Sequence, residues 1–350
     1  MKLHLQPQPI PATQIPFLGQ AVLSASKGSA DRHLALAAIG EPADLLGRFE
    51  HIPSATDAGP PLVRRLTGGC AYRVGRGAWV AHLALPRLEE LGASRPRVGS
   101  RLPLPPLLPL TKLLNRYVRP FMGGLNRLGA RTFYPGRDRL RAGDGLLAMV
   151  SFHLEAQGAV LFEMLICAAP GSLELSSVAQ RLRFPAEALP AAVPFVSLDQ
   201  LVGSRLPLEA FADRLRQHLS STCGIELTQG PPLPSGPERG ASLPEVWQPD
   251  CEGYCGVWGC GQLAELWAGV RLSGAVLSSC RVRGAFLGPP ATLRSLESSL
   301  AAAPLEPHEL GRRLQRSLGG AEPLLGLGRC EVLIDMIVRA SRAQLSYTPP

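Results

Sequence analysis

Hydrophobic positions along the chain follow two spacings that predict alternating strands and helices. Short apolar runs predict strands over residues 33–39, 45–50, 61–63, 78–85, 131–134, 145–152 and 159–167. The Gln157-Gly158 pair predicts a turn that joins the last two of these strands into a hairpin. Apolar residues at helical spacing predict helices over residues 111–128, 173–182 and 208–219, and one or two helical turns over 17–25.

A proline- and glycine-rich stretch predicts where the first unit ends. Residues 229–244 contain Pro-Pro-Leu-Pro-Ser-Gly-Pro, which is typical of a linker. Beyond it, a Ser-Gly turn at 273–274 predicts a hairpin, and helical spacing predicts helices over residues 293–300, 307–318 and 330–340. We therefore expect an α+β domain over residues 1–228 and a smaller α+β domain over residues 245–350.

Composition agrees with two globular domains and narrows the function classes. The chain has 350 residues, of which 45% are hydrophobic, enough for two buried cores. No apolar run reaches the ~18 residues of a membrane helix, and the N-terminus lacks the apolar segment of a signal peptide, so we expect a cytoplasmic protein without a membrane partner. The net charge of +8 comes mainly from scattered arginines. It can attract an acidic partner but indicates neither DNA nor RNA binding.

The segment Arg-Arg-Leu-Thr-Gly-Gly-Cys-Ala at residues 64–71 combines two cations, a hydroxyl and a glycine pair between predicted strands. Glycines let backbone N–H groups approach a phosphate or carboxylate, and arginines add charge-assisted hydrogen bonds. The segment is neither a P-loop nor a Rossmann fingerprint, because no Gly-Lys-Ser/Thr follows and a third spaced glycine is absent. We interpret it as an anion-binding loop; a hairpin turn with two solvated arginines is the alternative.

Several segments, in this order, resemble the lipoate–protein ligase family, whose catalytic fold is shared with biotin–protein ligases. They lie at residues 46–49, 64–71, 136–140, 196–203 and 281–286. The resemblance covers most of the chain. It implies an α+β fold with a class II synthetase-like catalytic domain, in which helices flank a mixed sheet, and the accessory C-terminal domain of the long ligases.

The resemblance also implies a reaction. Family members use ATP and Mg²⁺ to activate lipoate or octanoate as an acyl-adenylate, then transfer the acyl group to a lysine of a lipoyl carrier domain, either a dehydrogenase E2 domain or a glycine-cleavage H-type protein. By position, Arg65 would contact the nucleotide phosphate. The adenylate and the acyl tunnel would be lined by Gly68, Gly69, Cys70, Ala71, Tyr72 and Arg73.

Three positions depart from the family pattern. The family's lysine, expected to contact the adenylate, falls on Leu146 or Leu147, and none of the three lysines of the chain lies near these positions. Losing one preorganised donor at such a site typically lowers the rate by about 10²–10³. Cys70 replaces the third glycine of the loop, and Arg139 replaces an aspartate expected near the metal and nucleotide.

These departures leave three functions open. The protein is a ligase impaired by the missing lysine, a non-catalytic relative that binds lipoyl or acyl groups, a carrier domain or a partner ligase, or a cysteine-dependent acyltransferase. In the third case Cys70 would be the nucleophile, because neighbouring arginines favour a thiolate. His82 and His153 lie on predicted strands and are candidate bases.

A cysteine cluster offers a separate candidate site. Cys251, Cys255 and Cys260 lie within ten residues, and Cys280 follows in the predicted hairpin. Four thiolates can bind zinc or an iron–sulfur centre, although the paired Cys-x₂-Cys spacing of zinc ribbons is absent. Reduced thiols in a loop are the alternative.

Overall fold

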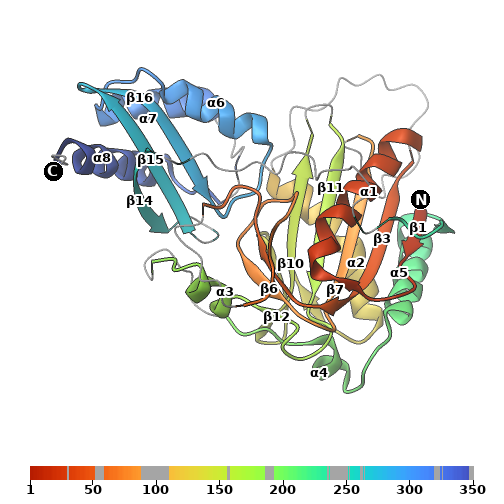
Figure 1. The fold of residues 1–350 in the computed structure, drawn as a ribbon. Helices are drawn as coiled ribbons and strands as arrows, with labels where there is room; N and C mark the ends of the chain where they lie inside the picture. Colours follow the sequence, from red (N-terminus) through yellow and green to blue (C-terminus); the bar gives the residue numbers. More distant parts are fainter. Residues whose placement is uncertain are drawn as a thin grey trace, which may run out of the picture.

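The computed structural model shows two units that contact each other (Figure 1). We call their boundary the seam; it includes Phe49 of the first unit and Leu263, Ala285 and Leu287 of the second. The first unit contains a large sheet flanked by helices, and the second contains a small sheet with three helices. The structure describes residues 1–29, 31–51, 59–87, 110–155, 158–185, 193–234, 236, 251, 253–260, 263, 265–318, 324 and 326–346.

A mixed sheet forms the centre of the first unit. Its strands, in spatial order, are β13 (Thr228–Gln229), β1 (Lys2–Leu5), β3 (His33–Glu41), β7 (Trp79–Leu85), β11 (Val160–Ile166), β10 (Gly145–Leu154), β9 (Arg139–Ala142) and β8 (Thr132–Phe133). A further short strand, β2 (Ile10–Pro11), pairs with β3. β13, β1 and β3 run parallel, whereas all neighbours from β3 to β8 are antiparallel.

Helices cover both faces of this sheet. They are α1 (Ile15–Ser29), preceded by the 3₁₀ turn Ala12–Gln14, α2 (Leu110–Arg127) and α5 (Leu208–Cys223). On one face, Gly19 of α1 lies against His82 of β7. On the other face, Phe211 of α5 stacks on Trp79 with ring centroids 5.8 Å apart, and α2 packs beside α5. His82 and Trp79 are three residues apart on β7, so they point to opposite faces.

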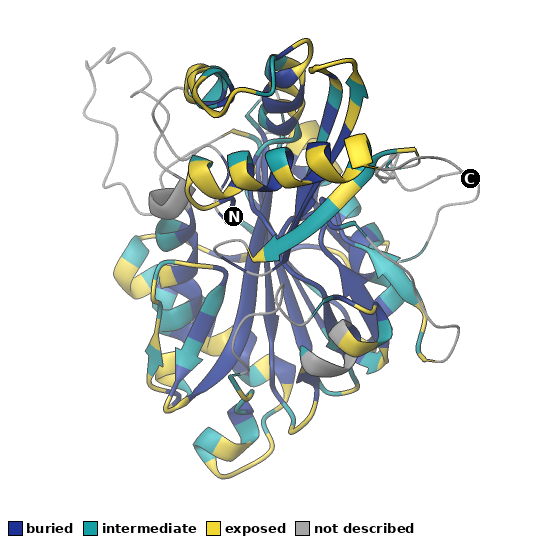
Figure 2. Ribbon diagram, turned by 90° about the vertical axis from the view of Figure 1, so that its left-hand side faces the viewer, coloured by how far each residue is buried: buried dark blue, intermediate teal, exposed yellow. Residues whose placement is uncertain are grey.

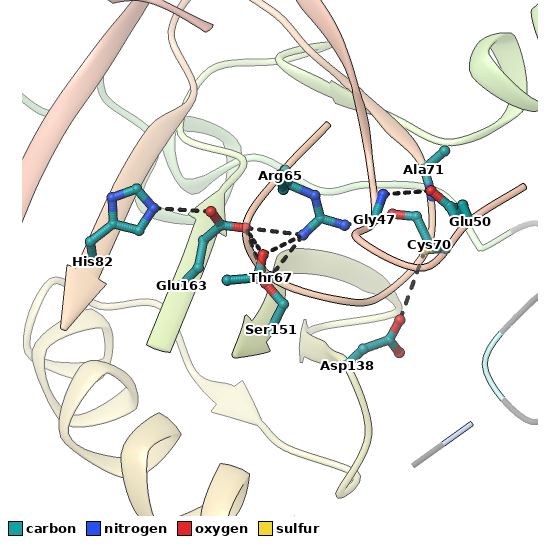
Figure 3. Close-up of polar contacts among 10 residues, drawn as sticks. All are labelled: Gly47, Glu50, Arg65, Thr67, Cys70, Ala71, His82, Asp138, Ser151 and Glu163. Atoms are coloured by element: carbon teal, nitrogen blue, oxygen red, sulfur yellow. Dashed lines mark hydrogen bonds and ion pairs between the residues drawn. The ribbon is translucent and has the colours of Figure 1, made fainter. Parts of the chain in front are cut away.

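A four-stranded sheet carries the loop at residues 64–71. Its strands, in spatial order, are β12 (Leu173–Glu174), β6 (Tyr72–Val74), β4 (Ala43–Leu46) and β5 (Leu62–Arg64), and the short helices α3 (Ser176–Arg181) and α4 (Leu198–Val202) lie after it in the chain. The loop runs from β5 to β6. The loop lies against β10 and β11 of the large sheet, because its Gly68 N–H donates to the Phe152 carbonyl of β10 and its Arg65 pairs with Glu163 of β11 (Figure 3).

The second unit is a three-stranded sheet packed against helices. Its strands are β14 (Cys255–Cys260), β15 (Glu265–Ser273) and β16 (Val276–Gly284), and its helices are α6 (Pro290–Leu300), α7 (Pro307–Leu318) and α8 (Cys330–Ser346). α8 packs on β14 and β15, and α6 packs on β16. No helix among the described residues is long and apolar enough to span a bilayer.

Each unit has its own core, and the two cores exchange side chains at the seam. Figure 2 shows buried residues along the strands of the large sheet and exposed residues on the outer faces of the helices. Phe49 of the first unit packs in the core of the second, and its ring lies 5.1 Å from that of Phe286. Leu263, Ala285 and Leu287 of the second unit pack in the core of the first.

Most predicted elements agree with this fold, but the strand expected over residues 45–50 ends at Leu46, the last residue of β4. The expected hairpins correspond to β10–β11 and β15–β16, and the mixed α+β fold is confirmed. The expected helix over 173–182 begins as β12, and the cysteines at 255 and 260 lie in β14 rather than in a loop. The start of the expected linker is bonded to β1, because the Gly230 N–H donates to the Leu3 carbonyl. Residues 235 and 237–244 of that linker lie outside the described residues.

Candidate functional site

The loop at residues 64–71 is held by close backbone contacts with the segment after β4. The Arg48 N–H donates to the Thr67 carbonyl at 2.9 Å. A Cβ on Gly47 would lie only 1.8 Å from the Gly69 carbonyl oxygen, so glycine is required at residue 47. Gly69 itself has a φ of 91°, which side-chain-bearing residues rarely adopt. The glycines of both segments thus permit this loop to form.

Arg65 is buried inside the loop, with 1% of its surface exposed. Its Nη1 donates to Glu163 Oε1 at 3.0 Å, and to the hydroxyls of Ser151 and Thr67 at 3.2 Å each. Its Nη2 donates to the Cys70 carbonyl at 2.9 Å (Figure 3). Both terminal nitrogens of the guanidinium are therefore engaged by the protein itself.

Glu163 on β11 supplies the negative charge that Arg65 faces. Its Oε1 also accepts from Thr67 at 2.8 Å, and its Oε2 accepts from His82 Nε2 at 3.0 Å. Burial alone would raise the pKa of Glu163, but the His82 hydrogen bond and the Arg65 charge lower it to about 2. The arginine expected to meet a nucleotide phosphate is thus neutralised by a carboxylate of the same chain.

A second carboxylate, Glu50, occupies backbone donors of the loop. Its two oxygens accept the N–H groups of Gly47 and Ala71, at 2.5 Å each, and its side chain is fully buried. Arg64 folds over the same segment and donates to the carbonyls of Gly47 (2.8 Å) and Glu50 (2.9 Å). Glu50 therefore sits where the loop was expected to receive an external anion.

The glycine pair of the loop is covered by the second unit. The Gly69 N–H donates to the Phe286 carbonyl at 3.1 Å, and the Gly68 N–H to the Phe152 carbonyl at 3.4 Å. A Cβ on Gly68 would lie 2.2 Å from the Phe286 oxygen. The backbone groups expected to bind a phosphate are hydrogen-bonded within the chain.

Cys70 lies in an acidic, buried environment. Its Sγ is 3.9 Å from Asp138 Oδ2, and 4% of the residue is exposed (Figure 3). Burial and the Asp138 carboxylate raise the pKa of the Cys70 thiol well above its ordinary value. The structure therefore favours the neutral thiol, contrary to the expectation drawn from the neighbouring arginines.

Arg139, the third departure, connects the two units. Its Nε lies 3.4 Å from Asp138 Oδ1, and its Nη2 donates to the Leu263 carbonyl of the second unit at 3.1 Å. Burial raises the pKa of Asp138, and the Arg139 charge opposes that rise. The guanidinium of Arg139 thus stabilises the Asp138 carboxylate and forms a hydrogen bond between the two units.

Leu146 and Leu147 are both buried, with at most 1% of either exposed. The Leu146 N–H donates to the Pro194 carbonyl, and Leu147 packs in the core of the first unit. Lys2 and Lys27, the lysines whose side chains are described, pair instead with surface carboxylates, Asp31 at 3.3 Å and Glu155 at 3.1 Å. Buried apolar side chains therefore stand where the resemblance implies a lysine ammonium group.

Tyr72 and Arg73, the last two expected tunnel residues, also have internal partners. The Tyr72 ring lies 4.4 Å from the Arg65 guanidinium carbon, and Tyr72 is 2% exposed. Arg73 donates to both oxygens of Asp44, at 2.7 and 3.1 Å. Tyr72 therefore supports the Arg65 network, whereas Arg73 stabilises the four-stranded sheet.

The four cysteines of the proposed cluster are spread over the second unit. Cys255 pairs with Val270, which in turn pairs with Cys280, so these two thiols lie on strands that are not neighbours. Cys260 lies at the opposite end of β14 from Cys255, roughly 17 Å away at the usual strand rise. Among the described residues no group of three or more His, Cys, Asp or Glu side chains, Cys251 included, could hold a metal ion. The candidate cluster from the sequence is therefore not assembled among the described residues.

The acidic members of this site were missed from the sequence. Glu50 directly follows the family-like segment at 46–49, and Glu163 is the one acidic residue in the apolar strand over 159–167. A charge inside an apolar strand signals a buried partner. Its partner, Arg65, is 98 residues away in the chain, so the pairing could be read only from the fold.

The residues present do not fit a nucleotide with Mg²⁺. Arg65 and the N–H groups of Gly69 and Ala71 are already hydrogen-bonded to protein atoms. Neither leucine at the lysine position can contact a phosphate. A bound phosphate would compete directly with Glu163 and Glu50, so no step through ATP follows from this geometry.

Comparisons with known proteins bear on the fold. No protein-family model matches the sequence, and no curated protein matches it. Among solved structures, LipL1 of P. falciparum in complex with lipoate matches with a TM-score of 0.60 and 10% identity, covering 96% of this chain and 98% of that chain. Lipoate-protein ligase A bound with ATP matches with a TM-score of 0.46 and 14% identity, over 66% of this chain and 89% of that one.

A third structure, the bipartite lipoate protein ligase of Thermoplasma acidophilum described with its E2 lipoyl domain, has a TM-score of 0.46 and 13% identity, over 66% of this chain and 87% of that one. The LipL1 match extends over both units, whereas the other two cover about two thirds of the chain. At such low identity these matches concern the fold and not the activity. The chain therefore has the α+β fold of the lipoate–protein ligase LipL1 across both of its units.

Proposed function

We propose that this protein is a non-catalytic relative of the lipoate–protein ligases that binds a lipoyl carrier domain. The observation that carries the proposal is the internal occupation of the loop at residues 64–71. Glu163 neutralises Arg65 and Glu50 accepts the Ala71 N–H, so the groups that would bind an adenylate are used within the chain.

The energetics of buried charge support this reading. Arg65 and Glu163 are 1% and 3% exposed, and removing one partner of such a pair typically costs about 3–5 kcal/mol. A nucleotide would have to displace Glu163 from Arg65 and leave that carboxylate buried without its cation. The net charge of +8 can still attract an acidic carrier domain to the surface.

A working ligase is the second candidate, and one observation favours it. The fold matches LipL1, solved with lipoate, over 96% of this chain, including the second unit. In that case the loop would release Glu50 and Glu163 when substrate binds, and ATP with Mg²⁺ would activate lipoate or octanoate despite the leucines at residues 146 and 147.

One experiment separates the two candidates. A lipoyl carrier domain is incubated with this protein, ATP, Mg²⁺ and lipoate or octanoate, and its intact mass is measured; binding of the same domain is measured by calorimetry. We expect binding without a change in mass. An acyl-sized increase that requires ATP and is lost in Arg65→Ala would establish the ligase, and absence of both binding and mass change would refute both candidates.

The control reaction uses an authentic lipoate ligase with the same carrier preparation. Arg313→Ala serves as a matched control variant, because Arg313 lies on α7 of the second unit and pairs with Glu309 of the same helix. It should bind the carrier as the unaltered protein does. This comparison separates an effect of Arg65 from a general effect of losing one arginine.

A further inference from the structure

Two carboxyl groups face each other across the seam between the units. Glu50 belongs to the segment after β4, and Glu265 is the first residue of β15. Their side chains are hydrogen-bonded to each other, and at most 3% of either residue is exposed. Two buried carboxyl groups can form such a bond only when one of them holds a proton.

The surroundings decide which group holds that proton. Burial raises the pKa of Glu50 too, but Glu50 accepts two backbone N–H groups and faces the charges of Arg64 and Arg65, which oppose that rise and stabilise its anion. Glu265 faces the acidic Asp138, and its Oε1 has no hydrogen-bond partner among the described atoms. Burial and the Glu50 charge raise the pKa of Glu265 well above its ordinary value. Glu265 is therefore the neutral acid that donates to the Glu50 carboxylate.

This hydrogen bond lies among the other contacts that close the seam. The Gly284 N–H donates to the Phe49 carbonyl at 2.9 Å, next in sequence to Glu50. Within the second unit, the Ala285 N–H donates to the Glu265 carbonyl at 2.9 Å, and the next residue, Phe286, accepts the Gly69 N–H across the seam. Glu265 is thus connected through the Ala285 N–H to Phe286, whose carbonyl accepts the Gly69 N–H.

We propose that the Glu50–Glu265 hydrogen bond is a proton-operated clasp between the two units. With the proton in place, the second unit covers Gly68 and Gly69. When Glu265 loses the proton, two carboxylates face each other in a buried seam, and their repulsion separates the second unit from the loop. This exposes the Gly69 N–H to solvent.

The sign of the pH dependence follows from the chemistry of this pair. A carboxyl whose pKa is raised in the closed state stabilises that state while it is protonated, and the stabilisation is lost as pH rises through its pKa. The other ionisable groups facing the pair are Arg64, Arg65, Asp138, Arg139 and Cys70. The arginines stay charged throughout the range, whereas burial also raises the pKa values of Asp138 and of the Cys70 thiol. Replacing Glu265 by an amide therefore identifies which of these groups opens the seam.

The seam contains its own optical reporters. The Trp258 and Trp267 rings lie 5.7 and 4.6 Å from the His51 ring, across the same boundary. We would record tryptophan emission and the radius of gyration by small-angle scattering from pH 6 to pH 10 on the full chain, with far-ultraviolet circular dichroism to verify folding. We expect emission to shift to longer wavelength and the radius of gyration to rise in one reversible step while helix content stays constant.

The decisive variant is Glu265→Gln, whose amide can donate the same hydrogen bond but cannot ionise. It should remain closed over the whole range, and Glu309→Gln, on α7 away from the seam, should open as the unaltered protein does. A seam that stays closed in the unaltered protein until it unfolds, or a Glu265→Gln variant that opens at the same pH, would overturn the proposal. The measurement involves no carrier domain, so it is independent of the proposed function.

Discussion

Glu163 shows how one residue balances the buried charge of the first unit. It accepts hydrogen bonds from Arg65, Thr67, Ser151 and His82, and these partners come from the loop, β10 and β7. A carboxylate in an apolar sheet is stable only with such compensation. The Glu163 carboxylate likewise stabilises the buried guanidinium of Arg65.

We predict that Glu163 makes the protein acid-sensitive within a defined range. Because its pKa falls from 4.5 to about 2 on folding, it contributes about 3 kcal/mol of stability that is present above about pH 4.5 and lost as pH falls towards 2. Glu163→Gln should lower the free energy of unfolding by about this amount at pH 7, and the difference should shrink as pH falls from 5 to 3. Urea unfolding at several pH values measures both effects.

Glu155→Gln is the control for that measurement. Glu155 pairs with Lys27 at the surface, where such pairs contribute roughly 0–1 kcal/mol. Its substitution should change stability little at any pH. A pH-independent loss in Glu163→Gln would show that packing, and not the charge pair, is responsible.

We predict that the Cys70 thiol is inert in the folded protein. Its burial and its acidic neighbour Asp138 disfavour the thiolate, which is the reactive form. With iodoacetamide at pH 8, Cys70 should be alkylated roughly tenfold or more slowly than the exposed Cys260, and rapidly once the chain is unfolded. Peptide mass spectrometry reports both sites together. Rapid labelling of Cys70 in the native state would restore the acyltransferase hypothesis.

At the scale of elements, the segment around Gly47 and the segment around Phe286 both approach the loop closely. Only glycine, which has no Cβ, leaves room for these contacts. The Gly68 backbone approaches the Phe286 carbonyl, and Gly47 approaches the Gly69 carbonyl. These contacts determine where the second unit rests. A side chain that enlarges the loop at Gly68 would therefore also displace the second unit.

We predict that Gly68→Ala disturbs the seam rather than the sheets. Its Cβ would lie 2.2 Å from the Phe286 oxygen, so the second unit must shift, at a cost of roughly 1–3 kcal/mol. Thermal unfolding should show this loss, and the seam tryptophans should emit at longer wavelength. Gly28→Ala in α1, where a Cβ meets nothing within 4 Å, should be neutral or slightly stabilising. Equal behaviour of the two variants would contradict the close contact at Gly68.

Elements that depend on local patterns were predictable, and contacts between distant segments were not. The helices at 208–219 and 307–318 agree with α5 (Leu208–Cys223) and α7 (Pro307–Leu318), because amphipathic spacing and a preceding or initial proline define them locally. β14 was missed because its glycines and cysteines lack a strand pattern, and pairing with β15 creates the strand. The loop at 64–71 was recognised from its composition, whereas its occupants Glu50 and Glu163 come from other segments.

At the scale of the whole molecule, Arg139 joins the two units at a position where the resemblance to the lipoate–protein ligases implies an aspartate. An aspartate at this position would place a second carboxylate beside the buried Asp138. The arginine instead lies 3.4 Å from Asp138 and donates to the Leu263 carbonyl of the second unit. One side chain thus balances a buried charge and joins the units.

We therefore predict that Arg139→Ala weakens the association of the two units. Asp138, which is 1% exposed, loses the cation at 3.4 Å, and Leu263 loses a donor. Because the Arg139 side chain is 16% exposed, we expect a loss of about 2 kcal/mol, below the ~3–5 kcal/mol typical of fully buried pairs. Arg141→Ala on the same strand removes only a bond to the Asp144 carbonyl, so its effect should stay within about 0.5 kcal/mol. Chemical unfolding gives both values, and small-angle scattering should show expansion in Arg139→Ala alone; equal, small effects in both variants would mean that the seam holds without this arginine.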